Sequence, residues 1–240
     1  MLRHLNTWFE SIHPMQCYGF LHPAVTYRDL EEDRMSPVLS AAVCAVSSLF
    51  LSSGSEDRAF AERCNRVVKL QISSTTGIFS KQRLAYLVLT SLYDFMIGDW
   101  SKLWEYTATA ARLVMALQLN VDTVGGSFIE QESARRLAWQ VYLNDRILSG
   151  GFDEYVVLAH DKLLLSLPCS EQNFQDNKPV RTEPLRMDLD AASHHLESPS
   201  MRASYIKLFA IRREVLRYVW GLCTPPASRS MPFHRRSNVV

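Results

Sequence analysis

Few residues of this sequence have the types and spacing that catalysis requires. Ser204 and Lys207 stand three positions apart, the Ser-x-x-Lys pattern of some acyl-transferring enzymes, and on a helix this spacing would bring the hydroxyl near the amine. The companion motifs of those enzymes do not occur, and four-residue patterns arise by chance in many proteins. The sequence also contains no Gly-rich phosphate loop, no His-Glu-x-x-His and no Gly-x-Ser-x-Gly. We interpret Ser204 and Lys207 as ordinary helix residues and predict that the chain is not an enzyme.

The spacing of cysteines, histidines and acids predicts no metal centre and no other cofactor. Successive cysteines are at least 20 residues apart, whereas zinc sites and thiol–disulfide motifs use pairs about two to four residues apart. Five widely spaced cysteines instead fit buried, reduced thiols in an intracellular protein. Adjacent side chains on a helix point about 100° apart, so we interpret His194 and His195 as a solvated pair. The acid pairs Asp153-Glu154 and Asp188 with Asp190 lie in polar stretches, where acid–base catalysis is not expected.

One cluster of charged and aromatic residues has a spacing that indicates a shared role. Five of its members succeed one another at intervals of three or four, so they lie along one ribbon of a helix: Glu132, Arg136, Trp139, Tyr142 and Arg146. Arg135 and Asp145 lie to the side of this ribbon. Guanidinium, ring and carboxylate groups could form a semi-buried hydrogen-bonded network that fixes how the helix docks. We prefer this structural role to a ligand-binding one.

Helices must position this cluster, because apolar residues recur with helical period through most of the chain. Helices are predicted from Pro37 to Phe50, from Ser55 to Gly77, and over 81–97, 100–120, 129–148 and 201–221. From 152 to 198 the periodicity fades, and we expect irregular chain crossing the surface. The predicted fold class is all-α, a multi-helix bundle of packed αα-hairpins with an irregular crossing segment.

The apolar stripes of two helices predict which side chains face the core. For the helix that starts at Ser55 the inward residues would be Ala59, Phe60, Cys64, Val67, Val68 and Gln71. For the helix over 81–97 they would be Leu84, Leu87, Val88, Leu92, Phe95 and Met96.

Composition bounds the remaining possibilities. The 240 residues are 47% hydrophobic and carry 26 basic against 25 acidic side chains, a net charge of +1. This length fits one large domain, and the neutral balance gives no reason to expect nucleic acid or a membrane surface as a partner. The longest apolar run, 38–51, is shorter than the ~20 residues of a membrane span. Residues 202–240 are strongly basic, which we interpret as a solvated face rather than a phosphate-binding one.

Three stretches together resemble the fungal-specific transcription factor domain, the middle homology region of zinc-cluster transcription factors. They are the Phe-Leu-His-Pro segment from Phe20, the helix pair that ends in Ala110-Ala111-Arg112-Leu113-Val114-Met115-Ala116-Leu117-Gln118-Leu119, and the run from Glu132 to Arg146. The last is similar to the family's Glu-x-x-Arg-Arg-x-x-Trp-x-x-Tyr-x-x-Asp-Arg pattern at every specified position. A Gly-Arg-Pro that the family usually has after this run is replaced by Gly150-Gly151-Phe152.

The resemblance implies a transcriptional regulator in the nucleus that pairs with other transcription proteins or with a second copy of itself. We expect a lead-in at 1–19, a helical regulatory domain at 20–221 and a disordered basic tail at 222–240. Zinc is expected only in a DNA-binding cluster that these residues do not encode, so DNA contact would be indirect. A small-molecule inducer would lie between helices beside Trp100, Trp104 and Tyr142. The alternatives are a helical module that pairs with a full-length regulator and, ranked lowest, an enzyme with an unrecognised site.

Overall fold

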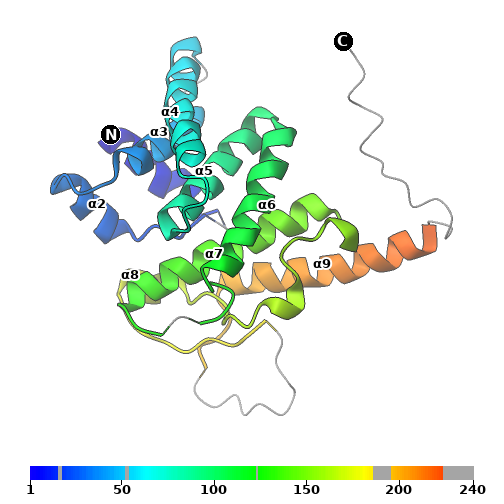
Figure 1. The fold of residues 1–240 in the computed structure, drawn as a ribbon. Coiled ribbons are helices and arrows are strands. Elements are labelled where there is room, and N and C mark those ends of the chain that lie inside the picture. Colours follow the sequence, from blue (N-terminus) through cyan, green and yellow to red (C-terminus); the bar gives the residue numbers. More distant parts are fainter. Residues whose placement is uncertain (16–17, 52–53, 123, 186–195, 224–240) are drawn as a thin grey trace, which may run out of the picture.

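The computed structural model describes residues 1–15, 18–51, 54–122, 124–185 and 196–223. Within these ranges the chain forms helices joined by turns and loops (Figure 1): α1 (Leu2–Thr7), α2 (Pro23–Glu31), α3 (Pro37–Leu51), α4 (Ser55–Ser74), α5 (Lys81–Ile97), α6 (Trp100–Ala116), α7 (Phe128–Ser149), α8 (Glu171–Gln175) and α9 (Met201–Cys223). A π-helical turn spans Trp8–Ile12, and 3-10 turns span Asp153–Tyr155 and His160–Lys162. The described ranges contain isolated β-bridges but no strand. The predicted all-α class is confirmed.

Capping side chains explain why the central helices start and stop where the sequence predicts. The Ser80 hydroxyl accepts a hydrogen bond from the Arg83 amide and begins α5, which ends at Gly98 with φ +81°. Asp99 then accepts from the Lys102 amide and begins α6. At α7, Ser127 and Glu130 form a reciprocal capping box. The α5–α6 hairpin therefore turns in two residues.

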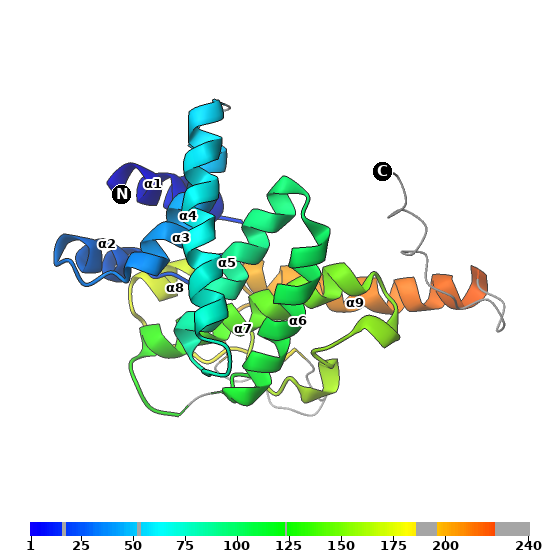
Figure 2. The same cartoon turned by 45° about the horizontal axis from the view of Figure 1, so that its top comes forward.

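The helices pack as two αα-hairpins, α3–α4 and α5–α6, with α7 crossing α5 and α6. Turning the molecule shows the same arrangement and shows that α9 runs beside α7 and extends beyond the other helices (Figure 2). The packed αα-hairpins of the prediction are therefore confirmed.

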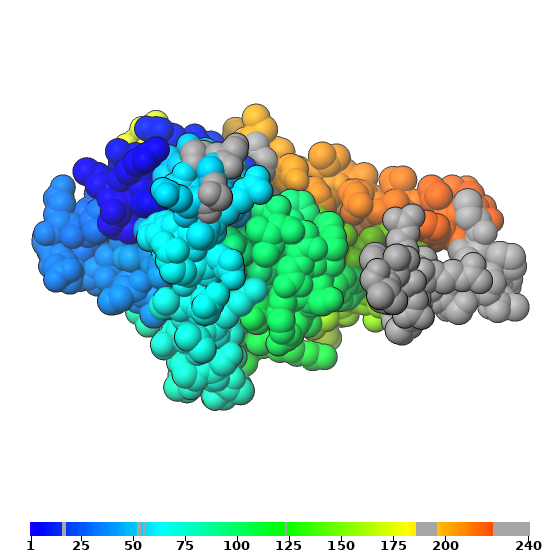
Figure 3. All heavy atoms as spheres, turned by 90° about the horizontal axis from the view of Figure 1, so that it is seen from above, coloured from blue at the N-terminus to red at the C-terminus, as the bar shows by residue number. Residues whose placement is uncertain are grey.

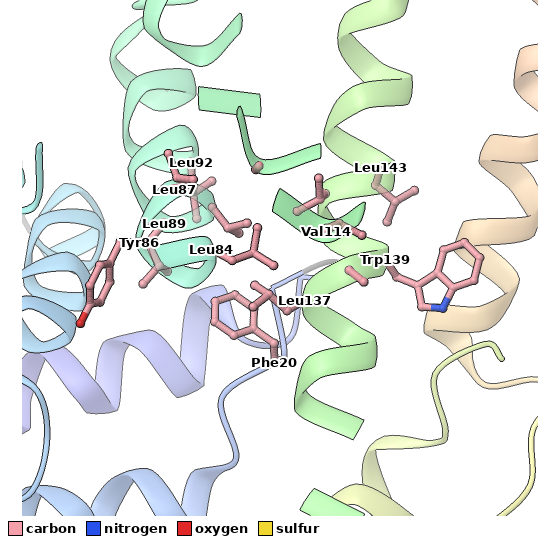
Figure 4. Close-up of a cluster of buried hydrophobic side chains, with 14 of the residues drawn as sticks. Phe20, Leu84, Tyr86, Leu87, Leu89, Leu92, Val114, Leu137, Trp139 and Leu143 are labelled. Carbon is pink, nitrogen blue, oxygen red and sulfur yellow. The ribbon is translucent and has the colours of Figure 1, made fainter. Parts of the chain in front are cut away.

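The core is centred on α5 and extends from the N-terminal segment, α3 and α4 to α6 and one side of α7. Figure 4 shows Leu84 and Leu87 of α5, Val114 of α6 and Leu137 of α7 gathered around Phe20, all buried. Trp139 points from α7 to the opposite side, toward α9 and the crossing chain. The helix α7 is therefore buried on two sides, which accounts for the near-absence of exposed residues along its length.

The first 19 residues contribute to this core. Leu5, Trp8 and Ile12 are fully buried, and the Trp8 ring packs edge-on against Phe20 at 6.4 Å between centroids. The sequence pattern predicts no helix here and none at α2 or α8, because each is short and offers little periodicity.

Two predicted inward faces are partly wrong. The buried stripe of α4 is Ala61, Asn65, Val68 and Ile72, and Ala59 and Val67 are exposed, so the face is rotated from the predicted one. On α5 the last turn projects past the core, leaving Phe95 and Met96 49% and 39% exposed.

The helix α6 ends at Ala116 rather than near Asn120, since Gln118 adopts φ +55° and the Leu119 amide bonds back to the Val114 carbonyl.

Some predictions fall outside the described residues. These are the roles of His194, His195, Asp188 and Asp190, and the tail at 224–240.

None of the helices in the described ranges is long and apolar enough to cross a bilayer.

Replacing Trp8 by alanine should destabilise the domain by about 3–5 kcal/mol, the cost of truncating a large buried aromatic residue. Urea unfolding followed by circular dichroism measures this loss. Leu2→Ala, in the same segment but 57% exposed, should change stability by less than about 0.5 kcal/mol. Equal effects of the two substitutions would show that the N-terminal segment is not part of the cooperative core.

Candidate functional site

The charged and aromatic cluster lies entirely on α7, and the fold buries it. The side chain of Arg135 is 13% exposed, and the other six residues are 3% exposed or less: Glu132, Arg136, Trp139, Tyr142, Asp145 and Arg146. Their contacts divide the cluster into an ionic half at the start of the helix and a backbone-binding half at its end.

Glu132 is the centre of the ionic half. Its carboxylate accepts hydrogen bonds from Arg136 Nε at 2.9 Å, from Arg135 at 2.5 Å and from the Cys169 amide at 3.0 Å. Arg135 also binds Asp122 at 3.0 Å, in the loop before α7. A fully buried carboxylate is tolerated here because two guanidinium groups and an amide satisfy it.

Arg136 extends the network from α7 to three other segments. Its Nη1 atom donates to Glu171 at 2.8 Å and to the Gly19 carbonyl at 2.9 Å. Its Nη2 atom donates to the Cys169 and Ser170 carbonyls at 3.2 and 3.3 Å. The guanidinium lies 3.9 Å from the centre of the Phe174 ring, a cation–π contact.

Glu171, at the first position of α8, accepts hydrogen bonds from the N-terminal segment, from α7 and from α9. It accepts from Arg136, from His13 at 2.7 Å and from Arg202 of α9 at 3.2 Å. Burial alone would raise the pKa of Glu171, but the hydrogen bond from His13 and the charge of Arg136 hold it well below its ordinary value. Arg202 also donates to the His13 and Met15 carbonyls. The N-terminal segment, α7, α8 and α9 therefore meet at one ionic node, formed by Glu132, Arg136, Glu171, His13 and Arg202.

The Phe-Leu-His-Pro segment is fixed beside this node. Nδ1 of His22 accepts from the Val25 amide at 3.3 Å, capping α2, so the ring proton is on Nε2, which donates to the Phe174 carbonyl at 3.1 Å. Burial lowers the pKa of His22 and favours this neutral form. The same Phe174 ring therefore contacts His22 edge-on and Arg136 face-on.

The second half of the cluster binds the irregular chain that follows α7. Asp145 accepts from the Val157 and Leu158 amides at 3.1 and 3.0 Å, and Arg146 donates to the Leu158 carbonyl. The Tyr142 hydroxyl bonds to His160 at 3.2 Å, and the Trp139 indole donates to the Ser166 carbonyl at 2.8 Å.

These contacts follow a consistent order. As the α7 residue number falls from 146 to 132, its bound partner advances from Leu158 through His160 and Ser166 to Cys169. The crossing chain therefore runs antiparallel to α7, and the cluster supplies the hydrogen bonds that a strand partner would otherwise give it.

Burial sets the ionisation of the groups in the second half and of the neighbouring thiol. It raises the pKa of Asp145, against the opposing effect of the two amide hydrogen bonds, and lowers the pKa of Arg146. Burial and the Glu132 charge raise the pKa of Cys169 to about 12, so this thiol stays protonated and is a poor nucleophile.

The Lys207 ammonium is bound by Glu183, and Ser204 is exposed. The described ranges contain no group of three or more His, Cys, Asp or Glu that could hold a metal ion.

A cavity of about 450 Å³ opens beside the second half of α7. It lies between α5, α6, α7 and the start of α9, with the end of α3 and the N-terminal segment at its side. No charged side chain lines it: Met15, Tyr18, Phe50, Leu92, Phe95, Met96, Leu103, Gln140, Asn144, Ile147, Leu148 and Tyr205. Gln140 is 1% exposed and donates to Asn144 at 2.7 Å, while its carbonyl oxygen has no hydrogen-bond partner among the described residues. The cavity is therefore largely apolar, and Gln140, one of its lining residues, has an unsatisfied acceptor.

The residues predicted to line a pocket lie elsewhere. Trp100 is 54% exposed and packs edge-on against Phe95. Trp104 packs against Tyr155, and Tyr142 is fully buried in the cluster. A second, wider depression of about 670 Å³ lies between α2, α3, α5 and the start of α7, and charged residues, including Asp29 and Lys81, line it.

Comparison with known proteins identifies the class of protein to which this chain belongs. The fungal specific transcription factor domain family matches residues 5–237. The chain belongs to this family, and the resemblance drawn from the three sequence motifs is confirmed.

Several curated relatives are similar to this chain. It is 28% identical over 213 residues to the Zn(2)-C6 fungal-type transcription factor FTF1c of Fusarium oxysporum f. sp. lycopersici, covering 81% of this chain and 22% of that protein. It is 30% identical to FTF1a of the same fungus, covering 69% and 17%. An uncharacterized transcriptional regulatory protein of Schizosaccharomyces pombe is 26% identical, with 92% and 36% covered. The chain thus spans about a fifth to a third of these relatives, and no solved structure matches it.

Glu132→Gln should destabilise the domain by about 3–5 kcal/mol, because it removes the fully buried one of the two carboxylates that pair with the Arg136 guanidinium. Chemical denaturation of the two proteins measures the difference. Glu105→Gln, at an exposed ion pair on α6, should cost less than about 1 kcal/mol. A Glu132 variant as stable as the Glu105 variant would mean that the ionic node does not stabilise the fold.

Glu171→Gln should change how stability depends on pH. Because the folded-state pKa of Glu171 lies below its ordinary value of 4.5, the ionised carboxylate stabilises the fold above about pH 4.5, and this contribution is lost as the pH falls further. The difference in unfolding free energy between the native chain and the variant should therefore be largest near neutrality and shrink toward pH 3. Thermal unfolding across pH 3–7 measures this, with exposed Glu154→Gln as the control. A difference that stays constant with pH would rule out the ionic role of Glu171.

Proposed function

We propose that this chain is the regulatory domain of a fungal transcriptional regulator that acts in the nucleus. The observation that carries this proposal is the match of the fungal specific transcription factor domain family to residues 5–237. The names of the Fusarium and Schizosaccharomyces relatives support the same role. Those relatives are several times longer than this chain, so DNA contact would belong to a zinc cluster outside the 240 residues or would be made indirectly through other transcription proteins.

The regulatory signal would be a change in how the helices pack, and the cavity is the place where a small molecule would produce it. A ligand there would contact α5, α6, α7 and α9 together, and the ionic node links α7 and α9 to the N-terminal segment. Differential binding to two packings of these helices would shift their equilibrium.

The cavity lining restricts the chemistry of such an inducer. The charge-free, mostly apolar wall disfavours ions, and the unpartnered carbonyl oxygen of Gln140 favours a hydrogen-bond donor. A neutral, largely apolar molecule with one hydroxyl or amide N–H group is the ligand class that fits.

A second candidate is a helical interaction module that pairs with a full-length regulator or with another copy of this chain. The exposed apolar residues along α9 favour it. The two candidates differ in whether the chain alters transcription when it is brought to a promoter by itself.

The proposal is tested by fusing the 240 residues to a heterologous DNA-binding domain with a fluorescent tag in a fungal reporter strain. The fusion should change reporter expression several-fold relative to the DNA-binding domain alone and should accumulate in the nucleus. Cavity-filling Leu103→Trp, compared with exposed Leu70→Trp on α4, should alter this effect because it occupies the ligand space. A folded, nuclear fusion with no effect on the reporter would contradict the proposal.

A further inference from the structure

Arg146, near the end of α7, is a buried cation that makes no ion pair with any residue that the structure describes. It is 2% exposed, and its Nη2 atom donates to the Leu158 carbonyl. Its Nε and Nη1 atoms are also buried, and neither has a hydrogen-bond partner in the described ranges. The equally buried Arg136 is held by two carboxylates instead. Burying a charged donor without an acceptor costs stability, so these atoms indicate a partner that is not part of the described chain.

The acids closest to this guanidinium are bound by other donors. Asp145 accepts hydrogen bonds from two backbone amides of the crossing chain, one at each carboxylate oxygen. Asp153 and Glu214 each pair with Arg213 and with Arg217 of α9, and both acids are about half exposed. None of these carboxylates is therefore the ion-pair partner of the buried guanidinium.

A second guanidinium, that of Arg213 on α9, lies at the same level of the structure. The helix α9 follows the direction of α7 along one edge of the molecule (Figure 3): Ile206 lies beside the second half of α7, and Leu216 packs on Gly151, just past its end. Arg213, between these two contacts, is thus level with the last turns of α7, where Arg146 lies. Burial chiefly lowers the pKa of Arg146, and the positive charge of Arg213 lowers it further, as expected for neighbouring cations. The Nε atom of Arg213 is also buried without a partner among the described residues.

Two neighbouring guanidinium groups with unpartnered N–H groups favour an anion over water. A water molecule would accept hydrogen bonds from them but would leave their mutual repulsion in place, whereas an anion accepts the hydrogen bonds and also neutralises charge. The ion must be small, because neither of the two cavities described above is lined by Arg146 or Arg213. We propose that Arg146 and Arg213 bind one small monovalent inorganic anion, of the size of chloride, between α7 and α9.

The anion would fasten the second half of α9, as the ionic node fastens its start. Arg202 binds Glu171 and two carbonyls of the N-terminal segment, more than two helical turns before Arg213. Between these two attachments lies Tyr205, which lines the largely apolar cavity. Occupancy of the anion site would therefore stabilise the placement of the helix that forms one wall of that cavity.

The test is thermal unfolding of the purified 240-residue chain in sodium chloride and in sodium gluconate at equal ionic strength, followed by circular dichroism. Chloride should raise the unfolding temperature relative to gluconate, which is too large for the site. The rise should saturate, reaching about 3 °C at roughly ten times the dissociation constant. Arg213→Gln should abolish this difference between the two salts. Arg217→Gln is the matched control, because Arg217 binds the same two carboxylates but is 52% exposed, and it should retain the difference.

Arg146→Gln should also abolish the difference between the salts; if this variant does not fold, Arg213→Gln decides the question alone. Equal unfolding temperatures of the native chain in the two salts would overturn the proposal and would mean that water satisfies the buried N–H groups. So would a chloride effect that survives Arg213→Gln, or one that Arg217→Gln removes to the same extent, because the ion would then respond only to the exposed arginines. None of these results depends on the reporter experiment, so the failure of one proposal is distinguishable from that of the other.

Discussion

The burial of Glu132 with Arg136 is the constraint on which the rest of the structure depends. A carboxylate and a guanidinium removed from water are tolerated only if each remaining donor and acceptor is satisfied. Satisfying them requires Gly19 from the N-terminal segment, Cys169 from the crossing chain and Glu171 from α8, which in turn binds Arg202 of α9. The network therefore selects one relative placement of four segments. Apolar contacts alone would do so less specifically, because they are not directional.

Much of this architecture can be predicted from the sequence, and the features that cannot be predicted have physical reasons. The bounds of α5 follow from a Ser cap and a left-handed Gly, and the cluster on α7 follows from its spacing of three and four. The partners of that cluster are not predictable from local patterns, because Arg136 and the Gly19 carbonyl that it binds are 117 positions apart. The short helices α1, α2 and α8 gain their stability from tertiary packing rather than from periodicity.

The cavity shows the same division between local and distant information. Phe95 and Met96 continue the apolar period of α5, which predicts that they are buried. They are instead partly exposed and line a cavity that α7 and α9 complete. Trp100 and Trp104 are pocket candidates by residue type, but Trp100 projects into solvent beside Phe95 and Trp104 packs against Tyr155. Residue type identifies a side chain suited to binding, whereas only the fold determines whether space remains beside it.

The antiparallel order of the crossing chain on α7 has a consequence for synthesis at the ribosome. The contacts within each hairpin are close in sequence, so the hairpins can form early. Leu158, Ser166 and Cys169 emerge later and in that order, so their hydrogen bonds to α7 can form from the carboxyl end of α7 toward its start. Arg202 emerges last and joins a carboxylate that already holds His13. We therefore expect the ionic node of the nascent chain to remain incomplete until α9 has left the exit tunnel of the ribosome.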